Sequence, residues 1–156
     1  MNQPTSRGGV QFTFDWPLRV YYEDTDAGGI VFFANYLKFF ERARTEWLRA
    51  CGIDQRKLAE QCGIVFVVSE TAVQYRSPAR LDDMLTIASR IERLGKASVE
   101  FVQEAHRGGV VLAVGKVRVG CVDHVTLKPA ALPHSVSEAL RSDPLAFAAG
   151  MSTAGA

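Results

Sequence analysis

Three carboxylates stand beside two glycines and an apolar run near the start of the chain. Glu23, Asp24 and Asp26 precede the Gly28-Gly29 pair, and residues 30–33 (Ile-Val-Phe-Phe) follow it. A carboxylate close to a helix start can act on a carbonyl group as a nucleophile or as a general base, because unpaired backbone N–H groups there polarise the carbonyl. Glycines allow a ligand to approach the backbone closely. These residue types therefore predict chemistry on a carbonyl compound in apolar surroundings.

A simpler interpretation makes Asp26 a helix cap. Aspartate near a helix start commonly accepts hydrogen bonds from the first N–H groups of the helix, and without further information the cap is the more frequent outcome. Glu23 and Asp24 are best interpreted as solvated turn residues or as partners of Arg19 or Arg44. From the residues alone, both roles for Asp26 stay open.

The composition indicates one soluble globular domain. The chain has 156 residues, of which 47% are apolar and 22% are charged, enough to bury a core. Its 18 basic and 17 acidic residues leave a net charge of +1, which excludes an overall basic field for nucleic acid. The first ten residues lack the apolar region of a secretory signal, and no apolar run is long enough to span a bilayer. We therefore expect a cytoplasmic protein that holds any anionic ligand with a local group of Lys and Arg.

The cysteines and histidines show no spacing typical of a metal site or a catalytic triad. They are scattered along the chain: Cys51, Cys62, Cys121, His106, His124 and His134. We expect free thiols in a reducing compartment, with no metal and no cofactor.

A long amphipathic helix is predicted from Ala34 to Cys51, with Asn35 as its N-cap and Gly52 as its stop. Its expected apolar face consists of Leu37, Phe40, Trp47 and Cys51. Its expected exposed face consists of Lys38, Glu41, Arg42, Arg44, Glu46 and Arg49. Two shorter helices are expected over Asp54–Gln61 and Ser135–Arg141.

Five strands are predicted from alternation and from the turn residues between them. They are expected at Leu18–Glu23, Ile64–Arg76, Asp83–Leu94, Ala97–His106 and Val110–Asp123. Gly115 interrupts the last strand, which indicates a bulge or a close approach of the helix. A strand, a helix and then four consecutive strands predict an α+β domain, in which an antiparallel sheet packs on one long helix.

The residues around Asp26 resemble a family signature. Arg19-Val20, Thr25-Asp26, Gly29-Ile30-Val31 and Asn35-Tyr36 are similar to the signature of the 4-hydroxybenzoyl-CoA thioesterase family, and within it most resemble the Tol–Pal system-associated acyl-CoA thioesterase group. Three further stretches resemble that group: FERARTEWLR (40–49), SPARLDDML (77–85) and LKPAALP (127–133). The resemblance covers about residues 18–134.

The resemblance implies a hotdog fold, in which a five-stranded antiparallel sheet wraps around one long helix. Two chains would pair their sheets into a homodimer, or two dimers into a homotetramer, with the active site at the dimer interface. The single hotdog domain would cover residues 16–141. We expect a flexible lead-in over residues 1–15 and a disordered tail over residues 142–156.

The implied activity is hydrolysis of an acyl-CoA thioester to a free acid and CoA. By resemblance, Asp26 is the catalytic carboxylate, acting as nucleophile or general base, and the backbone N–H of Phe33 polarises the thioester carbonyl. Gly29, Lys96 and Ser98 match substrate-binding positions, the last two in the turn that holds the CoA moiety. The Tol–Pal-associated group usually carries Tyr-His at positions 32 and 33, where this chain has Phe-Phe. A backbone N–H role survives that change, whereas a histidine side-chain role does not.

Two other functions compete with thioester hydrolysis. A hydroxyacyl dehydratase of the same fold would be indicated by a motif of the His-Phe-Pro-Gly type, and the sequence contains no such motif. A non-catalytic acyl-carrier-binding or scaffold hotdog protein associated with the Tol–Pal envelope system stays as the alternative. For either function, the resemblance adds acyl-carrier protein or envelope-associated proteins as further expected partners, and a peripheral position at the inner membrane as a further expected location. The signature around Asp26 favours the enzyme, because a binding module needs no carboxylate at a thioester carbonyl.

Overall fold

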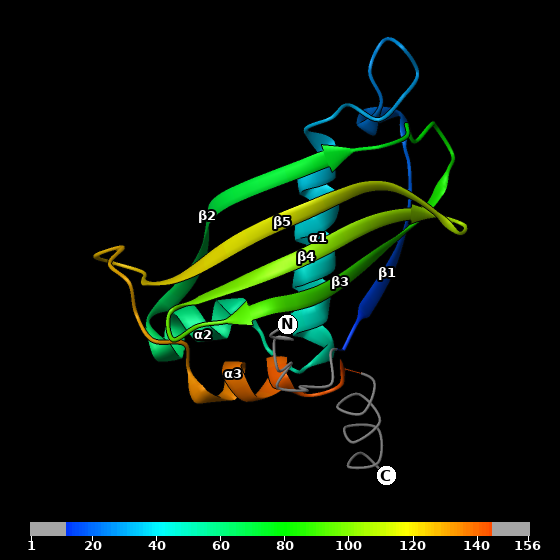
Figure 1. The fold of residues 1–156 in the computed structure, drawn as a ribbon. Helices are drawn as coiled ribbons and strands as arrows, with labels where there is room; N and C mark the ends of the chain where they lie inside the picture. Colours follow the sequence, from blue (N-terminus) through cyan, green and yellow to red (C-terminus); the bar gives the residue numbers. More distant parts are fainter. Residues whose placement is uncertain (1–11, 145–156) are drawn as a thin grey trace, which may run out of the picture.

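The computed structural model describes residues 12–144, in which one antiparallel sheet wraps around a long helix (Figure 1). Its strands pair in the order β1-β3-β4-β5-β2, with every neighbouring pair antiparallel. The strands are β1 (Phe14–Arg19), β2 (Ile64–Tyr75), β3 (Met84–Leu94), β4 (Ser98–Arg107) and β5 (Val110–Asp123). The helices are the 3-10 turn η1 (Tyr22–Asp24), α1 (Asn35–Ala50), α2 (Gln55–Cys62) and α3 (His134–Arg141). The predicted hotdog fold is confirmed.

The first strand lies earlier in the chain than predicted. β1 covers Phe14–Arg19 rather than Leu18–Glu23, and Tyr22–Asp24 forms η1 instead. Pro17 lies inside β1, opposite Thr86 of β3. A proline is tolerated there because β1 is an edge strand, whose outward N–H groups have no ladder partner to lose. The flexible lead-in predicted over residues 1–15 and the disordered tail predicted over residues 142–156 fall mostly on residues 1–11 and 145–156, which lie outside the described residues. Phe14 and Asp15, which the prediction placed in the lead-in, are the first two residues of β1.

The long helix begins and ends within one residue of its predicted bounds, and Gly52, with φ of 77°, follows its end. Its buried residues are Tyr36, Phe39, Phe40, Ala43, Trp47 and Leu48. Leu37, which was expected on this face, is exposed, because the stripe runs through Tyr36 and Phe40, one residue to its side. Asn35 is not the N-cap, which is Ala34.

The inner face of the sheet packs on α1 as the alternation predicted. Leu85, Ile87 and Ser89 of β3 and the matching residues of β4 are buried. One buried polar side chain, Gln103 of β4, ties the helix to the sheet. Its Nε2 donates to the Phe40 carbonyl at 2.9 Å and to the Ser89 hydroxyl at 2.8 Å, and its Oε1 accepts from Arg44 Nη1 at 2.9 Å.

Gly115 lies at a close approach of α1 to the sheet. A Cβ added at Gly115 would lie 2.5 Å from Cε2 of the Phe40 ring, which is itself fully buried. The register of β5 is regular on both sides of this residue. Of the two predicted explanations, the close approach of the helix is therefore correct and the bulge is wrong.

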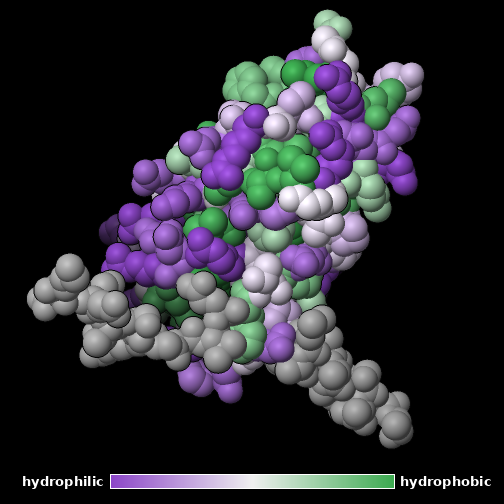
Figure 2. Space-filling view, turned by 45° about the vertical axis from the view of Figure 1, so that its right-hand side comes forward, coloured by the Kyte–Doolittle hydropathy of each residue, from purple (hydrophilic) through white to green (hydrophobic). Residues whose placement is uncertain are grey.

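Charged residues line the face of the sheet away from α1. Glu70, Arg118, Glu100 and Arg93 are successive cross-strand neighbours over β2, β5, β4 and β3, so their charges alternate in sign. Opposite charges facing one another across strands stabilise a sheet modestly. Figure 2 shows a surface on which hydrophilic residues predominate around a smaller hydrophobic patch.

Candidate active site

Asp26 heads a tight turn that is built by its own backbone and side chain. Its N–H donates to the Ile30 carbonyl and its carbonyl accepts from Gly29 N–H, while its Oδ1 accepts from Gly28 N–H at 2.8 Å. Gly29 has φ of 77°, a conformation that favours glycine. Thr25 pairs with Val31 on either side of the turn. The turn thus fixes one carboxylate oxygen, and Oδ2 accepts no hydrogen bond within residues 12–144.

The helix-cap interpretation of Asp26 is wrong. α1 begins at Asn35, well beyond the turn, and its N-cap Ala34 makes no side-chain cap. The carboxylate is exposed instead. The expected apolar enclosure is also missing from a single chain, because Phe32 and Phe33 are 43% and 61% exposed and only Val31 of this run is buried. If an enclosure exists, a second chain must complete it.

The two neighbouring carboxylates have separate positions. Asp24 is buried, and its Oδ2 accepts from Tyr21 N–H at 2.9 Å. Its carbonyl accepts from the Phe32 N–H and from Asn35 Nδ2, so it joins the start of the loop to the start of α1. Glu23 is exposed, as predicted. The predicted pairing of these carboxylates with Arg19 or Arg44 is wrong, since those two side chains donate to the Asp82 carbonyl and to Gln103.

Phe33 presents an unpaired N–H group next to the start of α1. Within residues 12–144, neither its N–H nor that of Ala34 donates a hydrogen bond. The Phe33 carbonyl accepts from the Tyr75 hydroxyl at 2.8 Å. Free N–H groups at this end of a helix favour negative charge on a bound oxygen. The backbone group predicted to polarise a carbonyl is therefore available.

The loop of residues 76–83 supports the Asp26 turn. The Ala79 carbonyl accepts from Val31 N–H at 2.8 Å, and Arg80 forms an isolated bridge with Ile30. Asp83 closes this loop by accepting from Arg80 N–H and from Arg107 Nη1, both at 2.8 Å. The position of the Asp26 turn thus depends on an ion pair behind it.

This ion pair predicts an acid-sensitive contribution to stability. Burial alone would raise the pKa of Asp83, but the Arg80 N–H and the Arg107 guanidinium outweigh it and lower the pKa. A folded-state pKa below the unfolded value gives stability that is present above about pH 4 and lost as the pH falls through the folded value. Between about pH 5 and pH 2 we expect wild type to lose up to about 1 kcal/mol more than Asp83→Asn, because both partners are partly exposed.

Urea unfolding of both proteins at several pH values measures this difference. Asp123, whose pKa is also lowered, chiefly by the N–H groups of Thr126 and Val125, is common to both proteins. Its contribution therefore cancels in the comparison. Parallel stability curves for wild type and Asp83→Asn would contradict the assignment.

Lys96 and Ser98 lie at the far end of the sheet from Asp26 of the same chain. β3 runs from Met84, which pairs with Arg19, to Leu94, just before the turn that carries Lys96. Its 11 residues, at about 3.3 Å each, span more than about 30 Å. Lys96 is exposed and Ser98 is half-buried. One chain therefore carries Asp26, Gly29 and Phe33 in one loop and leaves the two predicted CoA-binding residues apart from that loop.

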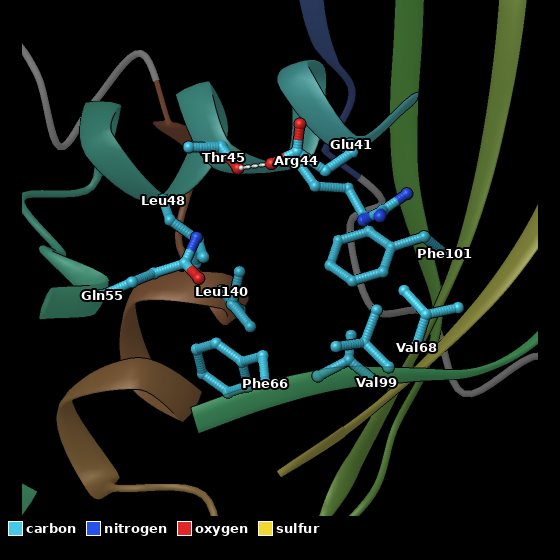
Figure 3. Close-up of a pocket in the computed structure, with 11 residues that line it drawn as sticks. Glu41, Arg44, Thr45, Leu48, Gln55, Phe66, Val68, Val99, Phe101 and Leu140 are labelled. Carbon is cyan, nitrogen blue, oxygen red and sulfur yellow. Dashed lines mark hydrogen bonds between the residues drawn. The ribbon is translucent and has the colours of Figure 1, made fainter. Parts of the chain in front are cut away.

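A pocket of about 160 Å³ lies between the second half of α1 and the sheet (Figure 3). Its apolar wall consists of Leu48, Phe66, Val68, Val99, Phe101, Val119 and Leu140. Its polar residues are Glu41, Arg44, Thr45 and Gln55, and the Thr45 hydroxyl donates to Glu41 at 2.9 Å. Since β2 is an edge strand and supplies Phe66 and Val68, the pocket lies beside an unpaired edge.

Sequence reasoning did not find this pocket. Arg44 was expected on the exposed face of the helix, yet it is half-buried. Burial lowers the pKa of Arg44 to about 10, although the nearby Glu41 carboxylate offsets part of that effect. The i, i+4 spacing of Glu41 and Thr45 is the one signal in the sequence that places two polar groups together on this side of the helix.

No three His, Cys, Asp or Glu side chains gather closely enough among residues 12–144 to hold a metal ion. The same part of the chain has no helix that is both long and apolar enough to cross a membrane.

Comparison with known proteins gives close and nearly full-length matches. The model of the thioesterase-like superfamily matches residues 20–140. The chain is 44% identical over 126 residues to acyl-CoA thioesterase YbgC of Haemophilus influenzae, covering 81% of this chain and 93% of that protein. It is 47% identical over 124 residues to acyl-CoA thioester hydrolase YbgC of Escherichia coli O6:H1, covering 79% and 92%. The crystal structure of a probable thioesterase from Bartonella henselae superposes with a TM-score of 0.73 at 37% identity, covering 78% and 99%.

Proposed function

Since this chain belongs to the thioesterase-like superfamily, we propose that it is an acyl-CoA thioesterase whose catalytic carboxylate is Asp26. The activity rests on relatives with that name that align over most of their length. The assignment of Asp26 rests on one observation. Within residues 12–144, its turn holds Oδ1 on the Gly28 N–H and leaves Oδ2 without a hydrogen bond, in the same loop that leads to the unpaired N–H groups of Phe33 and Ala34 before α1.

Two courses of the reaction are compatible with this geometry. In the first, Oδ2 attacks the thioester carbonyl, the CoA thiolate leaves, and water hydrolyses the resulting acyl-aspartyl anhydride. In the second, the carboxylate takes a proton from a water molecule that attacks the carbonyl. In both courses negative charge develops on the carbonyl oxygen. A preorganised donor such as the Phe33 N–H lowers the barrier most when it faces that oxygen.

We propose a homodimer in which the β2 strands of two chains pair. β2 is an edge strand of 12 residues with exposed Val67, Val68 and Tyr75, and a long unprotected edge favours pairing with another strand. A two-fold axis would make the pairing antiparallel. The Tyr75 end of one β2 would then lie beside the Ile64 end of the other.

This pairing completes the site from two chains. Ser98 pairs with Gly120, which pairs with Val67 of β2, so the turn that carries Lys96 lies at the Ile64 end. Across the two-fold axis, Lys96 and Ser98 of one chain approach the Asp26 end of the other. The pocket lined by Phe66 and Val68 belongs to the same chain as this Lys96 and lies at the same end of its sheet, so it also approaches the Asp26 end of the other chain. Lys96 can then contact the CoA phosphates as a point charge.

Substitution at the β2 edge should weaken the dimer. Successive strand residues face opposite sides, so Val67→Lys with Val68→Lys places one charge on each side of the edge, as natural edge strands do to prevent pairing. We expect wild type to have the mass of a dimer, or of a dimer of dimers, by light scattering after size-exclusion chromatography. The double variant should shift to half that mass. A variant of unchanged mass would place the interface elsewhere, and a monomeric wild type would rule out the proposed dimer.

The pocket limits the acyl group. In the proposed dimer this pocket of about 160 Å³ would face the Asp26 end of the other chain, and a cavity of about 150 Å³ accommodates a benzene ring. We therefore expect acyl groups of about six carbons or one ring to be the preferred substrates. The three cysteines are free, which suits a reducing cytoplasm, and we propose that compartment.

The proposed activity is tested by thiol release from a panel of acyl-CoA thioesters. The panel should include aliphatic chains of increasing length, single-ring aromatic acyl groups and one acyl group on acyl-carrier protein. Turnover of at least one acyl-CoA supports the enzyme, and the panel gives the acyl class. If purified dimer releases no thiol from any of them, the non-catalytic acyl-carrier-binding alternative becomes the better hypothesis.

A further inference from the structure

The C-terminal residue of β2, Tyr75, is hydrogen-bonded to the segment that carries the proposed N–H donor. Its hydroxyl donates to the Phe33 carbonyl at 2.8 Å, although the two residues are 42 positions apart. We propose that Tyr75 is a positioning residue that holds Phe33 in the orientation in which its N–H binds the thioester oxygen. This inference rests on the proposed function of Asp26 and Phe33.

The remaining anchors of this segment lie on either side of Phe33. The Phe32 N–H donates to the Asp24 carbonyl at 2.9 Å, and the Asn35 N–H donates to the Phe32 carbonyl at 2.9 Å. Asn35 Nδ2 also donates to the Asp24 carbonyl. Within residues 12–144, the Tyr75 hydroxyl is the only hydrogen-bond partner of the Phe33 backbone. Removing that hydroxyl therefore frees the peptide groups around residue 33 and leaves the other anchors in place.

Ring contacts reinforce this arrangement without replacing the hydrogen bond. The Tyr75 ring meets the Phe33 ring edge-on, with centroids 6.2 Å apart, and the Tyr36 ring at 5.5 Å. Such pairs fix the distance between rings, and a phenylalanine at position 75 would keep them. Of the contacts within residues 12–144, the Tyr75 hydroxyl is the one that is hydrogen-bonded to the Phe33 carbonyl and so orients it.

The same hydrogen bond acts on the following N–H group. The Phe33 carbonyl and the Ala34 N–H belong to one peptide unit, and a hydrogen bond to the carbonyl polarises that unit and strengthens its N–H as a donor. In the described part of the chain, the Ala34 N–H is also unpaired. Although Tyr75 is partly exposed, partial desolvation raises its pKa above the usual value for tyrosine, so the hydroxyl keeps its proton, and its donor role, throughout the pH range in which thioesterase assays are run.

Tyr75→Phe tests the proposal because it removes one oxygen and keeps the ring. We expect kcat for the preferred acyl-CoA to fall about fivefold to tenfold, the effect of losing one neutral hydrogen bond, with KM changed less than about twofold. Tyr22→Phe is the matched control. It removes the same atom from a tyrosine that is 82% exposed, and its activity should equal that of wild type.

A second measurement separates positioning from loss of structure. The carbonyl ¹³C resonance of Phe33 reports the hydrogen bond that it accepts, and it should move in Tyr75→Phe but not in Tyr22→Phe. A changed resonance with lowered kcat and an unchanged melting temperature supports the proposal. An unchanged kcat, or a fall in kcat that follows a fall in melting temperature, overturns it.

Asp26→Asn, assayed beside these variants, distinguishes the two levels of inference. If Asp26→Asn is inactive while Tyr75→Phe equals wild type, the Tyr75 proposal is wrong and the assignment of Asp26 stands. If Asp26→Asn is as active as wild type, the proposed site itself is wrong, and the Tyr75 proposal is rejected with it.

Discussion

Asp26→Asn is expected to lower kcat for acyl-CoA hydrolysis by at least about a thousandfold while KM stays within about threefold of wild type. The amide has the shape of the carboxylate, and its Oδ1 can still accept the hydrogen bond from Gly28 that closes the turn. The change therefore removes the nucleophile or base and keeps the position of the loop. Residual activity would come from the N–H groups near Phe33 and from binding alone.

The matched control for this prediction is Glu23→Gln. Glu23 is an exposed carboxylate in the same loop, so its neutralisation tests whether local negative charge, rather than the Asp26 group itself, is required. We expect activity within about twofold of wild type. Thiol release measures the activity of wild type, Asp26→Asn and Glu23→Gln, and circular dichroism shows whether each protein is folded. Equal losses in both variants would argue against a specific role for Asp26.

Isotope labelling then distinguishes the two courses of the reaction. In a single turnover in H₂¹⁸O, a general-base mechanism places the label in the product acid. A nucleophilic mechanism in which water attacks the aspartyl carbonyl of the anhydride transfers an unlabelled Asp26 oxygen to the acid and labels the enzyme. Mass spectrometry of the peptide that contains Asp26 reads the difference.

The sequence predicted the elements with strong periodicity and missed those that depend on neighbours. α1 and the strands after it were found because apolar residues recur at helical or alternating spacing. β1 was misplaced because Pro17 is acceptable in a strand only at an edge, and strand order is not a local property. Leu37 was assigned to the wrong face for a separate reason, since an error of one residue in a helical stripe moves a side chain by 100°.

Of the candidate site, the sequence predicted only those relations that join residues near one another in the chain. Asp26, Gly29 and Phe33 fall in one loop, and the family match confirms the resemblance that singled out that loop. Lys96 and Ser98 do not meet Asp26 within one chain, because their predicted role needs a second copy. Tyr75 could not be found from the sequence, since its contact with Phe33 joins the end of a strand to a loop 42 residues earlier.

Gly115→Ala is expected to lower the free energy of unfolding by about 3 kcal/mol, the upper part of the range for overpacked cores. The new methyl group would lie 2.5 Å from Cε2 and 2.9 Å from Cδ2 of Phe40. That ring is fully buried, and its helix is tied to the sheet by the hydrogen bond from Gln103 to the Phe40 carbonyl. Neither the ring nor the helix has room to withdraw, so the strain must be distributed through the core.

Gly120→Ala provides the matched control in the same strand. Its added Cβ would meet only ordinary contacts, with the nearest atom 3.7 Å away, so we expect a change within about 0.5 kcal/mol. Urea unfolding at one fixed protein concentration measures both variants, because association adds to apparent stability. If Gly115→Ala is no more destabilising than Gly120→Ala, the tight contact with Phe40 is wrong.

A double variant identifies the partner of the clash. Phe40→Leu alone should destabilise the protein by leaving space in the core. Combined with Gly115→Ala, the smaller side chain gives the methyl group room, so the two losses should fall short of additivity by at least about 1 kcal/mol. Strict additivity would mean that the methyl group strains the strand rather than the helix. The result bears on function as well, because the contact between Phe40 and Gly115 sets how closely α1, and with it the N–H groups near Phe33, is held to the sheet.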